Sequence, residues 1–244
     1  MMSAKRSILF CLWFVAPFLV GSSVYGGDKE IQTQDKTDPW LSGDASMEMV
    51  SRYVQAGNES AYSSPVFNSN FELEAFYFSL GLAEHIALQN AYKETDVYLD
   101  YTRPLGPLNI SLGYVYAYMV NSPNKSLHDF YGGISLPFAK YYTVALNGEA
   151  DVTQTVGTFT ELITTAKYPV IKDKILFSPY VGVGYSYGFS TGTTVGATGS
   201  VERFGINTPF TLSKNWELNF QVETVFSQQL NGLVWYGARV TYNF

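Results

Sequence analysis

The last ten residues, 235–244, constrain the fold most, because their side chains alternate strictly between two kinds. The apolar or aromatic set is Tyr236, Ala238, Val240, Tyr242 and Phe244, and the polar or small set between them is Gly237, Arg239, Thr241 and Asn243. A period of two indicates a β-strand with one apolar and one polar face. By itself this stretch fits two structures, the closing strand of a barrel and the edge strand of a soluble β-sandwich.

Composition favours the barrel. The chain has 244 residues, of which 46% are hydrophobic, 16% aromatic and only 15% charged, whereas soluble domains carry about 25% charged residues. Mean hydropathy is −0.01. Low charge with near-zero hydropathy fits a transmembrane β-barrel, in which apolar and polar residues alternate and cancel in any window average. Nucleic-acid binding requires a basic surface, so the net charge of −6 argues against a nucleic acid as a partner.

The first 26 residues have the pattern of a secretory signal peptide. Lys5 and Arg6 form a basic start, residues 8–20 are an apolar run, and Gly26 ends a stretch suited to cleavage. Residues 27–43 are polar without periodicity and are predicted to be a short tail. The barrel is predicted to span residues 44–244. The single cysteine, Cys11, lies in the signal, so no disulfide is expected in the mature chain.

From Asp44 onward, alternating segments follow one another with no helical pattern between them. Their length matches the ~9–11 residues that a tilted strand needs to cross a bilayer. Between Leu73 and Phe76 the apolar phase changes from odd to even positions, which requires a turn or a bulge at Glu74-Ala75. A turn gives twelve strands and a bulge eleven, and ten is a further alternative. We therefore predict an all-β fold, a transmembrane antiparallel up-and-down β-barrel of twelve strands.

The connections between these segments alternate in length. Residues 104–107, 137–140 and 212–215 form tight turns, whereas residues 55–65, 84–93, 120–127 and 188–199 form longer polar loops. Outer-membrane barrels have short periplasmic turns and longer outer loops. The Gly- and Thr-rich residues 188–200 are predicted to be a flexible outer loop.

Several stretches resemble known bacterial barrels. The terminal alternation is similar to the closing strand that the barrel assembly machinery of the outer membrane reads, which implies an assembly signal at Tyr236, Val240, Tyr242 and Phe244. The stretch Ser51-Arg52-Tyr53-Val54-Gln55-Ala56-Gly57 resembles the first strand of the TorF-type putative porins, and residues 94–101 and 106–116 are similar to later strands of that family. The resemblance implies a location in the bacterial outer membrane, with its lipid and the assembly machinery as partners.

The polar face is the predicted functional surface. Its charged candidates for lining a pore are Glu48, Arg52, Glu72, Asp96, Asp100, Glu149, Glu161, Lys167, Arg203, Glu217, Glu223 and Arg239. An acidic lumen attracts cations and repels anions, so we predict passive diffusion of small solutes with a preference for cations. The alternative is a closed structural or surface-interaction barrel, whose charges pair and fill a narrow lumen. A soluble periplasmic lipid-binding barrel ranks third.

The sequence gives no sign of an enzyme. It contains no Gly-x-Ser-x-Gly motif, and its two histidines, His85 and His128, lack metal-ligand spacing. Both histidines are predicted to lie at the outer rim. Ser126, His128 and Asp129 are close in sequence, but adjacent His and Asp side chains of a strand point to opposite faces, so they cannot converge as a triad requires. We predict no catalytic residue, no metal site and no cofactor.

Overall fold

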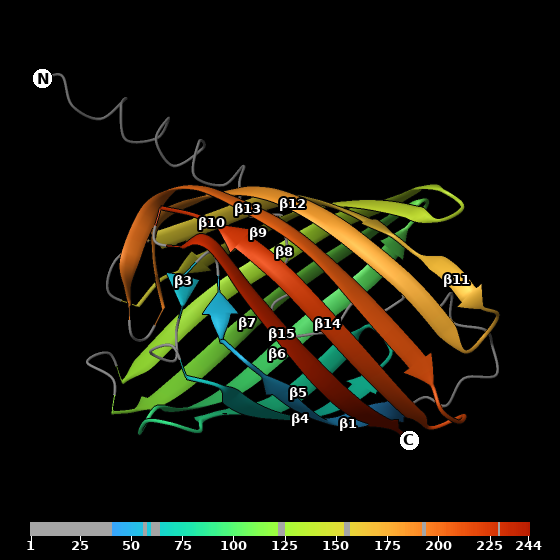
Figure 1. The fold of residues 1–244 in the computed structure, drawn as a ribbon, viewed down its shortest axis with the longest axis horizontal. Helices are drawn as coiled ribbons and strands as arrows, with labels where there is room; N and C mark the ends of the chain where they lie inside the picture. Colours follow the sequence, from blue (N-terminus) through green and yellow to red (C-terminus); the bar gives the residue numbers. More distant parts are fainter. Residues whose placement is uncertain are drawn as a thin grey trace, which may run out of the picture.

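The computed structural model describes residues 41–55, 58–59, 64–121, 125–153, 157–191, 194–228 and 230–244. The described part of the chain is a closed β-barrel (Figure 1). The strands are β1 (Leu41–Val50), β2 (Val54–Gln55), β3 (Asn58–Glu59), β4 (Val66–Ala75), β5 (Phe78–Ala87), β6 (Lys93–Leu105), β7 (Leu108–Val120), β8 (Ser126–Ala139), β9 (Tyr142–Asp151), β10 (Gly157–Ala166), β11 (Tyr168–Ile171), β12 (Ile175–Thr191), β13 (Thr194–Thr211), β14 (Trp216–Phe226) and β15 (Asn231–Asn243).

Twelve strands form the wall, which confirms the predicted fold class and strand number. β11 continues β10 after Lys167, and both pair with β12, so the two count as one wall strand. β2 and β3 form a separate two-stranded hairpin. The predicted signal peptide lies outside the described residues. β1 begins at Leu41, so the barrel starts three residues before the predicted boundary at Asp44. Among the described residues, no helix has the length and apolarity needed to cross a membrane.

The barrel closes where the last strand meets the first. β15 runs antiparallel to β1, with Glu48 opposite Arg239. At the end of this seam, Gly43 N donates to Phe244 O at 3.2 Å and Phe244 N donates to Gly43 O at 3.0 Å. Each wall strand is therefore paired on both sides. A bilayer offers no water to unpaired backbone groups, so closure is what allows a β-structure to span it.

The phase change near residue 75 is a tight turn, as predicted, but the turn lies two residues later. Ala75 pairs with Phe78, and Phe76 and Tyr77 form the turn, with Phe76 at a φ of 58°. Phe76 is therefore a turn residue rather than a strand residue. The turn is hard to locate from sequence because Phe and Tyr replace the Gly, Asn or Pro that usually mark a turn.

Two predicted outer loops are shorter than expected. Residues 188–200 were predicted as a flexible loop, but β12 extends to Thr191 and β13 begins at Thr194, so the strands continue as a hairpin. Threonine favours extended backbone, and the positive φ of Gly188 and irregular pairing around Phe189 accommodate the extension. Likewise β5 runs to Ala87, which reduces the connection predicted at residues 84–93 to residues 88–92.

The outer face of the barrel is apolar. Large apolar side chains alternate along the strands at exposed positions; examples are Met47, Leu80, Val97, Leu162, Val183 and Val234. The predicted assembly-signal residues Tyr236, Val240, Tyr242 and Phe244 are also exposed. A soluble protein rarely exposes so large an apolar surface, whereas a transmembrane barrel turns this face to lipid.

Three luminal tyrosines lie over glycines of the neighbouring strand. Tyr98 covers Gly81, and its hydroxyl donates to Glu72 at 2.9 Å on the strand beyond. The same arrangement links Tyr131, Gly113 and Asp100, and again Tyr180, Gly205 and Glu223. A side chain on any of these glycines would overlap the ring. Each tyrosine thus spans three strands and holds a carboxylate in place on the luminal wall.

Replacing Gly81 by alanine is expected to destabilise the barrel by about 1–3 kcal/mol, because the added Cβ would overlap the Tyr98 ring. The free energy of unfolding is measured by urea titration of the folded barrel in detergent micelles. Ser79→Ala, at the neighbouring luminal position of β5, is the control and should change stability much less. In a Tyr98→Ala background the cost of Gly81→Ala should vanish, and a cost that persists would show that the ring is not its cause.

Candidate functional site: the luminal charges

Ten of the predicted pore-lining residues share the luminal face of the wall strands. They are Glu48, Glu72, Asp96, Asp100, Glu149, Glu161, Arg203, Glu217, Glu223 and Arg239. The other two fall outside the strands, because β1 ends before Arg52 and Lys167 lies between β10 and β11. The sequence therefore predicts the face of most of these residues correctly. The structure also shows which of these residues contact one another.

Arg203 is the centre of one ionic cluster. Its Nε donates to Glu161 Oε1 at 2.7 Å and its Nη2 donates to Glu161 Oε2 at 2.6 Å. This is the bidentate geometry of the strongest arginine–carboxylate pairs. Its Nη1 lies 3.6 Å from Glu223 Oε2. Glu223 also accepts from Trp235 Nε1 at 2.9 Å and from the Tyr180 hydroxyl. Both glutamates are buried, so the arginine offsets the cost of placing them in the wall.

Arg239 forms a second cluster across the closing seam. Its Nη2 lies 3.1 Å from Glu48 Oε1 on β1. Gln221 donates to the same oxygen at 2.7 Å, and Asn68 donates to Glu48 Oε2 at 2.8 Å. Glu48 thus joins β14, β15, β1 and β4. In both clusters the charges pair along the wall between nearby strands, whereas the closed-barrel alternative predicted pairing across the lumen.

The opposite side of the lumen is acidic. Glu94 and Asp96 on β6, Asp129 on β8, and Glu149 and Asp151 on β9 are all buried. Asp129 lies directly opposite Asp151 in the β8–β9 register, and like charges in this position repel each other. The luminal positions of described β6, β8 and β9 include no lysine or arginine.

Three members of this acidic set were not among the predicted pore-lining residues. Glu94 was placed at the start of the strand-like stretch 94–101 without a role in the pore, and Asp129 was considered only as a catalytic partner of His128. Asp151 follows Glu149 at the next luminal position of β9. The period-two spacing from Glu149 was the one feature of the sequence from which the luminal position of Asp151 could have been predicted.

His85 is also luminal rather than a rim residue. Because β5 extends to Ala87, His85 lies within the strand and is buried. Its Nδ1 is 2.9 Å from Asn68 Oδ1, its Nε2 is 3.1 Å from Asp96 Oδ2, and the Tyr53 ring stacks on it at 4.8 Å between centroids. His85, Glu94 and Asp96 place one ligand atom each within 4.8 Å of one another. The sequence predicted no metal site, and the structure gives these three residues a spacing that could hold one ion.

The outer end of the lumen also contains apolar clusters, which corrects the prediction of a polar inner face throughout. After β1 the chain turns inward, where Tyr53 packs against one apolar cluster and Val54 against another. Trp235 packs against both clusters. The first includes Val66, Ala83, Ala87, Val115, Met119 and Leu127; the second is Phe159, Val201 and Val225. Since Tyr53 and Val54 are adjacent, this segment links the two apolar clusters inside the barrel. Its hairpin β2–β3 lies at the end opposite the carboxyl terminus (Figure 1).

His128 and Asp129 lie on opposite faces, as their adjacency predicted. His128 contacts the ring of Tyr116 at 5.1 Å, and its Nδ1 is 2.6 Å from the Tyr114 hydroxyl. Tyr116 belongs to the exposed outer face, whereas Asp129 is buried. The two side chains therefore cannot converge on one substrate.

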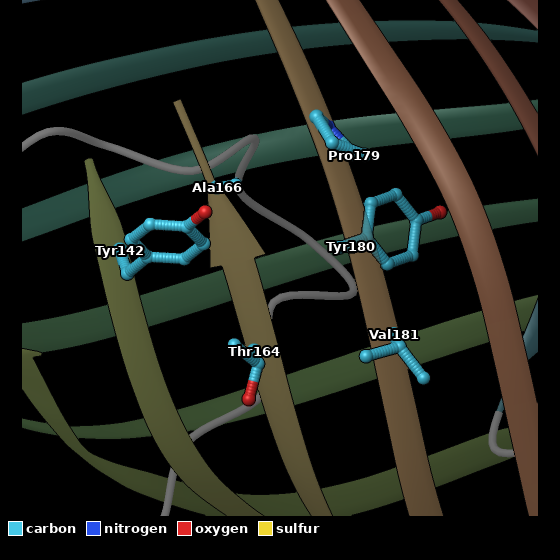
Figure 2. Close-up of a pocket in the computed structure, with 6 residues that line it drawn as sticks. All are labelled: Tyr142, Thr164, Ala166, Pro179, Tyr180 and Val181. Carbon is cyan, nitrogen blue, oxygen red and sulfur yellow. The ribbon is translucent and has the colours of Figure 1, made fainter. Parts of the chain in front are cut away.

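Figure 2 shows a pocket in the wall rather than in the acidic part of the lumen. Its lining residues come from β9, β10 and β12 and are Tyr142, Thr164, Ala166, Pro179, Tyr180 and Val181. Ala166 is a small residue between the Tyr142 and Pro179 side chains, which leaves the gap (Figure 2). The pocket carries no charged side chain and none of the predicted site residues.

The chain is similar in fold to solved porins. A KdgM porin in complex with disordered oligogalacturonate is 16% identical, with a TM-score of 0.57 over 83% of this chain and 99% of that one. The KdgM porin in a second structure is 15% identical with the same TM-score and coverage. A NanC porin is 9% identical, with a TM-score of 0.51 over 83% of this chain and 98% of that one. At such identities the likeness shows the fold alone.

No family model and no curated protein matches the sequence. The resemblance to the TorF-type porins therefore stays a prediction. The closed twelve-stranded wall, the apolar outer face and the porin fold together confirm an outer-membrane, porin-like barrel.

Replacing Arg203 by methionine is expected to cost about 3–5 kcal/mol of stability, because it leaves two buried glutamates without their cation. Unfolding in urea measures the loss. Arg103→Met is the matched control, since Arg103 is exposed on the outer face over the Tyr77 ring, and it should have a much smaller effect. Adding Glu161→Gln to Arg203→Met should restore part of the stability; equal losses in Arg203→Met and Arg103→Met would contradict the ionic cluster.

Proposed function

We propose that the protein is an outer-membrane channel for the passive diffusion of small solutes, with a preference for cations. The observation that carries the proposal is the uneven charge of the lumen. The two arginines on the described luminal face, Arg203 and Arg239, already pair with glutamates. The β6–β9 side presents Glu94, Asp96, Asp129, Glu149 and Asp151 without a basic residue at its own luminal positions. In a narrow wall of low dielectric constant such a surface concentrates cations.

The acidic lumen also bears on the class of solute. Oligogalacturonate is the ligand named for one of the similar porins, and each of its sugar units carries a carboxylate. The carboxylates of β6, β8 and β9 would repel a polyanion of this kind. We therefore propose small neutral or cationic solutes, and we do not extend the acidic oligosaccharide to this protein.

The second candidate function is a closed structural or surface-interaction barrel. The packing of Tyr53 and Val54 across the outer end favours it, because these side chains join apolar clusters on two sides of the lumen. The two candidates differ in one measurable property. A channel conducts ions in a planar bilayer and a closed barrel does not.

Purified, folded protein is expected to conduct in planar bilayers and to show a reversal potential of the sign that favours cations. The Glu149→Gln, Asp151→Asn double variant should lower the cation-to-anion permeability ratio toward one, because it removes two charges from the acidic side. Glu202→Gln is the control, since Glu202 is exposed at an outward position of β13. Absence of conductance would refute the channel, and anion preference in the wild type would refute the selectivity alone.

The Tyr53→Ala, Val54→Ala double variant is expected to raise single-channel conductance, because it removes the side chains that cross the outer end of the lumen. Met49→Ala, on the lipid-facing side of β1, is the control and should leave conductance unchanged. Conductance that appears only in the double variant would favour the closed barrel as the native state. Equal conductance in wild type and double variant would show that this segment does not constrict the path.

A further inference from the structure

The strongest feature not explained by diffusion is the cluster of His85, Glu94 and Asp96. The three residues come from neighbouring strands, β5 and β6, and His85 is directly opposite Glu94 in the register. All three are buried, Asp96 completely so. Their ligand atoms lie within 4.8 Å of one another, a spacing from which one ion can be reached by all three.

The imidazole of His85 is held in one orientation by a chain of hydrogen bonds. Asn68 Nδ2 donates to Glu48 Oε2 at 2.8 Å. Because an ionised carboxylate only accepts, this contact fixes the amide nitrogen of Asn68 on the Glu48 side. The amide oxygen therefore faces His85 Nδ1, at 2.9 Å. Since that oxygen is an acceptor, Nδ1 must carry the hydrogen and donate it.

This orientation leaves Nε2 as the ligand atom. Nε2 points to Asp96 Oδ2, 3.1 Å away. Because the lone pair of Nε2 and the carboxylate repel each other, a cation, either a proton or a metal ion, must lie between them. Metal-bound histidines usually donate their other ring N–H to an oxygen acceptor that fixes the tautomer. Asn68 occupies that supporting position, and the Tyr53 ring packs on the imidazole face.

A second, independent observation points to a cation. Asp129 is 1% exposed, and within the described part of the chain its Oδ1 has no hydrogen-bond partner. Its carboxylate is repelled by those of Glu149 and Asp151 and, to a smaller extent, by those of Glu94 and Asp96. A buried carboxylate of this kind is costly unless positive charge is near. A bound divalent ion would supply that charge.

We propose that His85, Glu94 and Asp96 form a binding site for a divalent transition-metal ion inside the lumen. One imidazole nitrogen with two carboxylates suits Zn²⁺ or Mn²⁺, whereas Mg²⁺ and Ca²⁺ prefer oxygen ligands alone. The Tyr92 hydroxyl donates to Glu94 and so orients the second ligand. The site adjoins Tyr53, and it does not depend on whether the barrel conducts.

The test uses the folded full-length barrel in detergent, stripped with EDTA and titrated with Zn²⁺ by isothermal calorimetry. We expect one ion per barrel, and a loss of affinity of at least about tenfold in His85→Gln, Asp96→Asn and the supporting variant Asn68→Ala. His128→Ala removes the other histidine, which lies on the outer face, and should bind as the wild type does. Zn²⁺ should also raise the thermal unfolding midpoint of the wild type but not that of His85→Gln.

Several outcomes would overturn the site. Absence of Zn²⁺ binding would leave His85 and Asp96 as a simple proton-bridged pair. Unchanged affinity in His85→Gln, or competition by Mg²⁺ at the concentration of Zn²⁺, would indicate general attraction to the acidic wall instead of coordination. If His85→Gln does not fold, as judged by heat-modifiable gel mobility, Asn68→Ala decides, since it keeps all three ligands and removes only the acceptor that orients the ring.

Discussion

Backbone pairing between the first and last strands is the constraint on which the rest of this structure depends. In lipid, each unpaired N–H or C=O costs several kcal/mol, so a sheet with open edges cannot remain in the membrane. The register that pairs Gly43 with Phe244 also places Arg239 opposite Glu48. Closure therefore fixes which charges meet across the seam. A shift of one residue would turn these side chains toward lipid.

The glycine–tyrosine contacts help to fill the wide interior of the closed barrel. A barrel of twelve strands has an interior too wide for small side chains to fill, yet its luminal face must carry polar groups. Tyr98, Tyr131 and Tyr180 lie flat over glycines and deliver their hydroxyls to carboxylates two strands away. Each ring covers wall surface, and each hydroxyl satisfies part of an acid that would otherwise be costly to bury. The wall thus gains packing and holds charge with the same residues.

Period-two alternation was enough to predict the fold class and the luminal face of Glu48, Asp96 or Arg203, because every wall strand keeps one face in lipid. The alternation of short and long connections favoured twelve strands over eleven. It could not predict what crosses the lumen. Tyr53 and Val54 look like a continuation of the first strand, and only the three-dimensional path shows that they turn inward. His85 was missed for a related reason: the loop was predicted to begin at Glu84, whereas pairing with β6 extends the strand past His85. Ion pairs between β10 and β13 depend on register, which a single sequence does not give.

The buried carboxylates of the luminal wall differ in what offsets their charge. Glu161, Glu223 and Glu48 are held by arginines, and Glu72 and Asp100 by tyrosines. These carboxylates are explained by the stability of the wall. On β8 and β9, Asp129 and Asp151 face each other although glycine or serine would pack there at no electrostatic cost. Such acids favour cations nearby, which is why the proposed cation preference and the proposed metal site both rest on this side of the lumen.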